Sequence, residues 1–196
     1  LLGRADSIRD FEAAVAGMAG VRAVRSEWRW DGVRQGAVVK VWYIGDLGIE
    51  DTICEALRHK SDTTVTIDVD RSTSKPLDLL LTIEIDSRRQ EKDVFGAVQS
   101  ALLDPQTGIL APEYIGIGQP LYRSPIFESV LAVEGAVAVT HIAYERSKTI
   151  TSGGHDKKRR KLSSFDAIAL KPGTGCYFDL EDKGSLKLNR RETTNG

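Results

Sequence analysis

The stretch LDLLLTIEID, residues 77–86, decides the fold class, because every second residue from Leu77 to Ile85 is apolar. Side chains two positions apart in a strand share a face, so this stretch predicts a strand with one buried face. The polar residues 71–75 (RSTSK) and Pro76 precede it and are typical of a joint. The sequence therefore predicts that a second structural module begins near residue 74.

Downstream of this strand, apolar residues at helical spacing predict helices over residues 94–102 and 124–133. Gly135 is expected to end the second of these helices, and a strand follows from Val137. Residues 104–123 are rich in proline and glycine. A connection of this length has a function of its own or contains a short strand.

Upstream of residue 77, the pattern predicts helix, strand, strand, helix and strand. Ser7 and Asp10 have the spacing of a capping box at the first helix, and Gly20 is expected to end that helix. Residues 28 and 30 carry tryptophans on the first strand. The five predicted elements cover residues 8–18, 24–30, 37–44, 49–57 and 64–69.

These elements predict an α+β fold with two small ferredoxin-like modules of the βαββαβ type in tandem, at residues 1–73 and 74–145. Each is incomplete: the first lacks its opening strand, expected upstream of the chain, and the second lacks a clear strand. One mixed sheet shared by both halves is the alternative. VAGMAGVRAV at 15–24 also matches VLAVEGAVAV at 130–139, which indicates either two copies of one unit or a common helix–glycine–strand corner.

The C-terminal quarter differs from these modules. Residues 146–163 are polar and contain the basic run 157–161 (KKRRK), so they predict a flexible basic loop. Residues 164–196 predict a C-terminal β-hairpin or meander followed by a tail. Its expected short strands lie at residues 165–170, 177–180 and 186–188.

Composition excludes several classes of protein. No apolar run approaches the roughly 20 residues that cross a bilayer, so no membrane association is expected. The net charge of −1 gives no global attraction to nucleic acid. Cys54 and Cys176 form no disulfide framework, which favours a reducing compartment. The chain begins at Leu1, and we expect it to be a piece of a longer protein.

Residues that could carry chemistry are scattered, so no catalytic, cofactor-binding or metal-ligating residue is predicted. A nucleophilic triad needs a histidine beside a nucleophile and a carboxylate, and a zinc site needs spaced Cys and His pairs. Asp68 and Asp70 share a sheet face but lack the rest of a calcium loop, so solvent-facing charge is expected. The three histidines are His59, His141 and His155, of which only His141 lies on a predicted strand.

One alternative function is single-stranded nucleic-acid binding. Trp28, Trp30 and Trp42 could form a stacking platform on a sheet, and the basic run 157–161 could bind phosphates. The basic run lies away from the tryptophan-bearing strands, and the rest of the chain cancels its charge. Nucleic acid is therefore an unlikely partner. A ligand-sensing regulator built from tandem modules is the other alternative.

Several segments, in order and spacing, resemble the C-terminal part of the baseplate J-like proteins of phage tails and contractile injection systems, in the baseplate assembly protein branch. The resemblance covers roughly residues 5–145, with 177–189 as a weaker match. Its main segments are residues 10–14 (DFEAA), 18–21 (MAGV), 77–86 (LDLLLTIEID), 94–103 (VFGAVQSALL), 108–112 (GILAP), 116–121 (GIGQPL) with Ser124, and 132–139 (AVEGAVAV).

The resemblance implies a structural, non-catalytic wedge component that binds other wedge and tail hub proteins and self-associates in the full-length protein. It implies a location in the bacterial cytoplasm during assembly and then in a tail or injection particle. The departures are the connection at 60–64 and the basic loop. The segment 104–123 is the expected interface loop, or alternatively a cover for the second module's own core. The candidate interface residues are Tyr114, Ile115, Ile117, Gln119, Pro120 and Tyr122.

Overall fold

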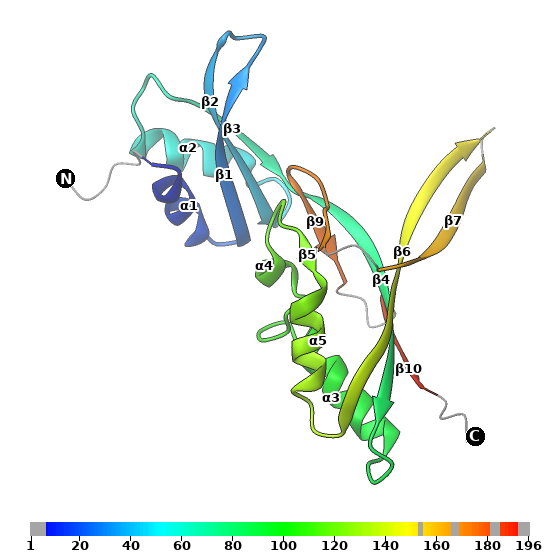
Figure 1. The fold of residues 1–196 in the computed structure, drawn as a ribbon. Helices are drawn as coiled ribbons and strands as arrows, with labels where there is room; N and C mark the ends of the chain where they lie inside the picture. The colour runs from blue at the N-terminus through cyan, green and yellow to red at the C-terminus, as the bar shows by residue number, and fades with distance from the viewer. Residues whose placement is uncertain (1–6, 153–154, 166–168, 181–184, 192–196) are drawn as a thin grey trace. The chain divides into compact units, whose positions relative to one another are not determined.

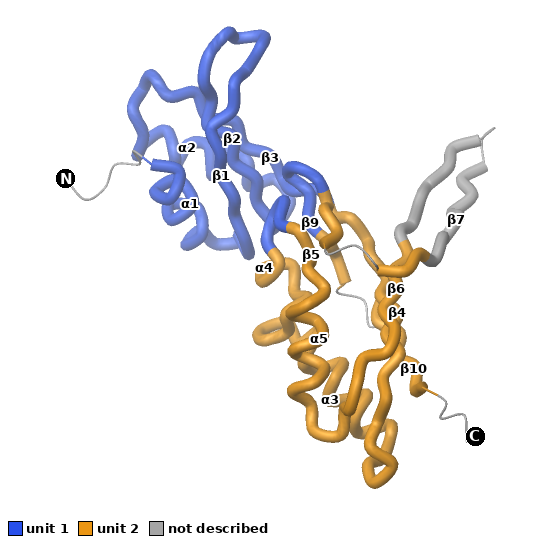
Figure 2. Tube along the Cα trace, viewed as in Figure 1, with its two compact units in different colours: residues 1–73, 116–119, 173–177 blue, residues 74–115, 120–172, 178–196 orange. Residues whose placement is uncertain are grey.

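The computed structural model describes residues 7–152, 155–165, 169–180 and 185–191. The chain forms two compact units of mixed helix and sheet, so the predicted α+β fold class is confirmed. Unit 1 comprises residues 1–73, 116–119 and 173–177, and unit 2 comprises residues 74–115, 120–172 and 178–196 (Figure 2).

Unit 1 begins with a capped helix. The Ser7 hydroxyl accepts a hydrogen bond from the Asp10 backbone N–H, and the Asp10 carboxylate accepts one from the Ser7 backbone N–H at 2.8 Å. This confirms the predicted capping box, which satisfies two backbone donors at the helix start. The elements of unit 1 are α1 (Ile8–Ala16), β1 (Val21–Asp31), β2 (Gly36–Gly45), α2 (Glu50–Lys60) and β3 (Thr66–Arg71) (Figure 1).

The sheet of unit 1 has the order β1-β2-β3, with β1 antiparallel to β2 and β2 parallel to β3. In a ferredoxin-like unit, the two strands that flank a crossover helix are split by another strand. Here β2 and β3 flank α2 and pair directly, from Val38–Thr66 to Tyr43–Arg71. The ferredoxin-like strand order is therefore not found in unit 1. Because β2 and β3 pair directly, they leave no place between them for the expected opening strand.

The two faces of this sheet are both partly buried, but by different residues. Helices α1 and α2 contact each other, α1 packs on β1 and α2 packs on β3. On the opposite face, Trp42 and Ile44 pack with Ile117 and Tyr177. The buried core under the helices consists of Phe11, Val15, Val39, Val41, Tyr43, Ile53, Leu57 and Ile67.

Strand β4 (Thr73–Ile85) is the centre of unit 2, and Leu77, Leu79, Leu81 and Ile83 on it are fully buried. The alternation that predicts this strand is therefore confirmed. The strand begins earlier than expected, at Thr73, so only Ser72 separates it from β3. The residues of the predicted joint, 71–75, continue the strands, and the chain passes from unit 1 to unit 2 among them, between Thr73 and Ser74.

The remaining elements surround β4. Helices α3 and α5 contact each other, α5 packs on β6 and α3 packs on β10. The main sheet has the order β10-β4-β6-β7, and β9 also pairs with β4. The elements are α3 (Glu91–Leu103), α4 (Pro112–Ile115), β5 (Leu121–Tyr122), α5 (Arg123–Leu131), β6 (Ala136–Ser152), β7 (His155–Ser164), β8 (Ala169–Leu170), β9 (Cys176–Asp179) and β10 (Leu186–Arg190).

Two predictions for the C-terminal quarter are wrong. The expected loop at 146–163 is the distal part of the antiparallel pair β6 and β7, in register from Ala143–Ser164 to Ser152–His155. The expected C-terminal hairpin or meander is not found among the described residues after 163 either. Strand β8 pairs with β5, whereas β9 and β10 both pair with β4. These short strands complete sheets whose other strands are far away in the sequence, which local patterns do not reveal.

The two units share one spatial arrangement in a permuted chain order. In unit 2, β4 is antiparallel to β6 and parallel to β10, just as β2 is antiparallel to β1 and parallel to β3. The helix contacts also correspond, since α5 packs on β6 and α3, and α3 on β10. Elements α5, β6, β4, α3 and β10 thus take the places of α1, β1, β2, α2 and β3. No helix among the described residues has the length and apolar character to cross a membrane.

Candidate protein-contact site

An apolar patch lies at the turn end of β1 and β2. Trp28, Trp30 and Val33 expose 49%, 67% and 94% of their surface, and we call these three residues the hairpin patch. Trp28 lies opposite Val39, which belongs to the core under α1 and α2, so the tryptophans share the helix-covered face of the sheet. The strands extend beyond the helices at this end (Figure 1), which leaves both indoles exposed.

Two ion pairs lie at the same end of the sheet as the hairpin patch, one on the opposite face and one at the turn. Arg29 lies 3.1 Å from Glu27, and Arg34 lies 3.5 Å from Asp31. Backbone N–H groups of Arg34 and Val33 donate to the Asp31 carboxylate and hold its pKa below the ordinary value. The hairpin end therefore carries exposed apolar surface on one face and ion-paired charge on the opposite face and at the turn.

The opposite face of unit 1 carries a charge cluster centred on Lys40. Its ammonium lies 2.6 Å from Asp68 and also contacts Asp70. Burial alone would lower the pKa of Lys40, but the hydrogen bonds to the two carboxylates raise it. The parallel register places Lys40 beside Asp68. Both aspartates are exposed to solvent as expected, whereas their lysine partner was not predicted because the register is invisible in the sequence.

The three tryptophans do not form the stacking platform considered for nucleic acid. Trp42 lies opposite Arg25, on the face of the sheet away from Trp28 and Trp30, and it is buried. The guanidinium of Arg29 lies over the Trp42 ring at 5.6 Å. The described residues of unit 1 thus separate the buried tryptophan from the two exposed ones. The basic run 157–161 lies on β7, and its side chains are outside the described part of the structure.

The candidate interface residues of 104–123 are divided between the two units. Ile117 is only 2% exposed and lies inside the apolar cluster of unit 1. Tyr114 and Tyr122 are exposed by 69% and 49%. Ile115 packs against the core of unit 2, and Gln119 and Pro120 are half-buried. The segment contains the short elements α4 and β5.

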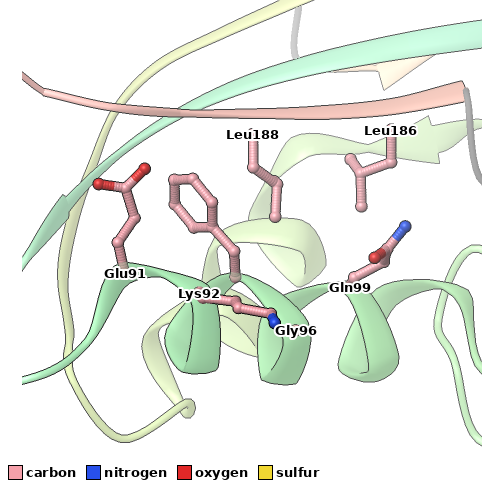
Figure 3. A pocket seen from close by; sticks show the side chains of 7 residues that line it. Glu91, Lys92, Gly96, Gln99, Leu186 and Leu188 are labelled. Carbon is pink, nitrogen blue, oxygen red and sulfur yellow. The ribbon is translucent and has the colours of Figure 1, made fainter.

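Unit 2 has an open groove between α3 and β10. Figure 3 shows Leu186 and Leu188 of β10 facing α3, with Glu91 and Gln99 at its two ends. Phe95 and Leu188 are half-buried, and Gly96 lies on the helix side of the groove. The volume is about 680 Å³. We call this feature the α3–β10 groove.

The histidines and cysteines stay apart in the described residues. His59 and His141 are exposed on α2 and β6, and Cys54 and Cys176 are half-buried free thiols. Among the described residues, no group of three or more His, Cys, Asp or Glu side chains is placed to hold a metal ion. The side chain of His155 is outside the described part.

Comparison with known proteins gives a likeness of fold. No protein-family model matches the chain, and no curated protein matches it by sequence. A chain from the cryo-EM structure of the anti-feeding prophage baseplate, 6-fold symmetrised, is similar with a TM-score of 0.51 at 8% identity. The likeness covers 97% of this chain and 38% of that chain. This protein therefore spans well under half the length of the baseplate chain it resembles.

Proposed function

We propose that this chain is part of a structural component of a phage-tail-like or contractile injection system baseplate, and that it acts by binding other protein subunits. The observation that carries this proposal is the fold likeness to an anti-feeding prophage baseplate chain over 97% of the residues. The finer assignment, to the baseplate J-like family and its wedge ring, rests on the sequence resemblance. The partners would be wedge and tail hub proteins, with self-association of the full-length protein.

The exposed apolar surface of unit 1 supports contact with other subunits as the mode of action. Unit 1 exposes two tryptophans, a residue type that dominates binding energy in protein interfaces. Two ion pairs at the same end of the sheet, Arg29–Glu27 and Arg34–Asp31, compensate their charges locally. Assembly would take place in the bacterial cytoplasm, and the protein would then remain in the particle.

Deletion of the gene tests this proposal directly. Particles from the deletion strain should lack assembled baseplates in negative-stain electron micrographs, and a plasmid copy of the gene should restore them. Intact particles should also contain the protein in a fixed ratio to the sheath subunit, measured by quantitative mass spectrometry. Normal baseplates in the deletion strain would contradict the proposal.

A further inference from the structure

We propose that the outer edge of β10 binds an extended segment of a different protein subunit as an added strand, and that this segment carries a bulky apolar side chain two residues from a carboxylate. The inference rests on the proposed function and deepens it, because it names the kind of segment that a partner subunit offers. Three features of unit 2 carry it: an unpaired strand edge, an apolar recess beside that edge, and two uncompensated lysines.

Strand β10 lies at one end of its sheet, and among the described residues it pairs only with β4. The Arg191 backbone N–H donates to the Ile83 carbonyl of β4. Backbone N–H and C=O groups of successive residues in a strand point to alternate sides, so those of Leu188 and Arg190 point away from β4. An edge with such unpaired groups is a template for the addition of another strand.

The α3–β10 groove lies next to this edge, because β10 is its strand wall. Leu186 and Leu188 face α3 across a recess of about 680 Å³ (Figure 3). Gly96 leaves the helix side of the recess open, and a Cβ placed there meets nothing within 4 Å. A strand added to β10 would point every second side chain towards the α3 side, so one of them can fill the space over Gly96. Pockets for alternate side chains give strand addition its specificity.

The charges at this edge favour an acidic segment. Lys92 lines the groove, Lys187 is exposed on the other face of β10, and neither makes an ion pair among the described residues. Arg190 and Arg191, by contrast, are already paired with glutamates. Lysines on an edge strand discourage unspecific pairing. A segment with carboxylates would compensate these lysines, whereas a second β10 edge would bring like charges together.

The spacing of the groove residues sets the sequence pattern of the segment. Lys92 and Gly96 are four residues apart on α3, which corresponds to about 6 Å along a helix. Residues two apart in a strand are about 7 Å apart along it. Figure 3 shows β10 running alongside α3, so a strand added to β10 runs alongside α3 as well. A carboxylate two residues from the side chain over Gly96 therefore reaches Lys92.

Three synthetic peptides provide the probe. The acidic peptide, Thr-Glu-Val-Leu-Val-Glu-Thr, places both glutamates and the leucine on one face of a strand. The basic peptide has lysines in place of the glutamates, and the serine peptide has serine in place of the leucine. Fluorescence anisotropy of the labelled peptides measures their binding to the 196-residue chain. The acidic peptide should bind on the order of 10-fold more tightly than either of the others.

Two variants of the protein test the groove itself. Gly96→Leu fills the recess and Lys92→Glu reverses its charge, and both new residues suit an exposed helix position. Each should weaken binding of the acidic peptide on the order of 10-fold, and Lys92→Glu should now prefer the basic peptide. Matched controls are Ala97→Leu and Lys60→Glu, both exposed outside the groove lining, which should bind as wild type does. Thermal melts by circular dichroism check that all four variants are folded.

Hydrogen exchange followed by NMR tests whether the peptide uses the strand edge. In the complex, the backbone N–H groups of Leu188 and Arg190 should exchange more slowly, because they gain hydrogen bonds to the added strand. Unchanged exchange at both positions would overturn strand addition. No binding of the acidic peptide at millimolar concentration, equal binding of the three peptides, or unchanged binding in Gly96→Leu would overturn the inference as a whole.

Two further outcomes separate this inference from its neighbours. Self-association of the chain that Gly96→Leu abolishes would identify a second copy as the occupant and reject the acidic segment. The double variant of Lys92→Glu and Gly96→Leu should restore few baseplates in the deletion strain. Full restoration would show that the protein is a baseplate subunit whose groove is not a contact, so the inference would fail while the proposed function stands.

Discussion

At the residue scale, Gly175 shows how a single position can fix the packing of unit 1. It has φ of +67°, and a Cβ placed there would lie 2.4 Å from Nε1 of the buried Trp42. Gly48 has a similar φ of +81° but nothing within 4 Å of a Cβ. Substitution of the two glycines therefore distinguishes the energetic cost of the left-handed backbone from that of the steric clash with Trp42.

We predict that Gly175→Ala lowers the free energy of unfolding by roughly 2–4 kcal/mol, because it combines a strained backbone with overpacking against Trp42. Gly48→Ala should cost only about 1 kcal/mol. Urea denaturation followed by tryptophan fluorescence measures both values. Equal losses in the two variants would show that Trp42 does not pack on Gly175.

Tyr43 gives a pH-dependent prediction. Its side chain is fully buried, and its hydroxyl donates to the Asp46 carbonyl at 3.2 Å. Burial raises the pKa of Tyr43 well above the ordinary value of about 10. The folded state thus favours the neutral phenol, so this contribution is complete below the unfolded pKa and is lost as pH rises from about 10 towards the folded pKa.

We expect Tyr43→Phe to cost about 1 kcal/mol at pH 7 through the lost hydrogen bond. Above pH 10 the stability of wild type should fall more steeply than that of the variant. Denaturation midpoints between pH 8 and pH 11 provide the measurement. Parallel curves would mean that Tyr43 does not titrate differently in the folded state.

At the element scale, the corner from helix to strand is the same in both units. Helices α1 and α5 end four residues before Gly20 and Gly135, which have φ of +83° and +96°. Each glycine carbonyl accepts a hydrogen bond of 2.9 Å, from the Asp46 and Asp86 backbone N–H respectively. Each following strand starts with a register shift at its first pair. The sequence echo between 15–24 and 130–139 therefore marks a repeated structural corner.

We predict that Gly20→Ala and Gly135→Ala both destabilise the protein, by at least about 1 kcal/mol from the left-handed backbone alone. Gly135→Ala should cost more, because its Cβ would lie 2.9 Å from the buried Val94 side chain. At Gly20 the nearest atom belongs to the carboxylate of the exposed Asp46. Chemical denaturation of the two variants tests this order, and a larger loss at Gly20 would contradict it.

Much of this element-level structure was predictable because it depends on local periodicity. The capping box and the strand from Leu77 to Ile85 need only neighbouring residues. Helix ends were placed too late, since Gly20 and Gly135 close a turn after the helix and not the helix itself. The strand β7 was missed because its polar sequence, HDKKRRKLSS, carries no alternation, whereas the strand at 186–188 was predicted but its pairing with β4 was not.

At the scale of the whole molecule, the sequence predicts two α/β modules but not their strand order. The correspondence of the five elements becomes visible only when pairing is known, since β10 joins β4 across about a hundred residues. We propose that the boundary between the two modules lies between Thr73 and Ser74, where the chain passes from unit 1 to unit 2. Nothing in the local sequence indicates that residues 116–119 and 173–177 belong to unit 1.

The contact site was predicted less well than the fold. The sequence directed attention to 104–123, where Ile117 is buried. The tryptophans at the exposed end of β1 and β2 were considered only as part of a nucleic-acid platform. Alternation places Trp28 and Trp30 on one face. It does not show that the strands extend past the helices that would cover them.

The central claim is that this protein works as a structural subunit of a baseplate, and a cryo-EM map of the isolated particle tests it most directly. The account predicts density for both units, in several symmetry-related copies, at the baseplate end of the tail. A complete baseplate map with no density for this fold, from particles of the strain that expresses the protein, would contradict the claim.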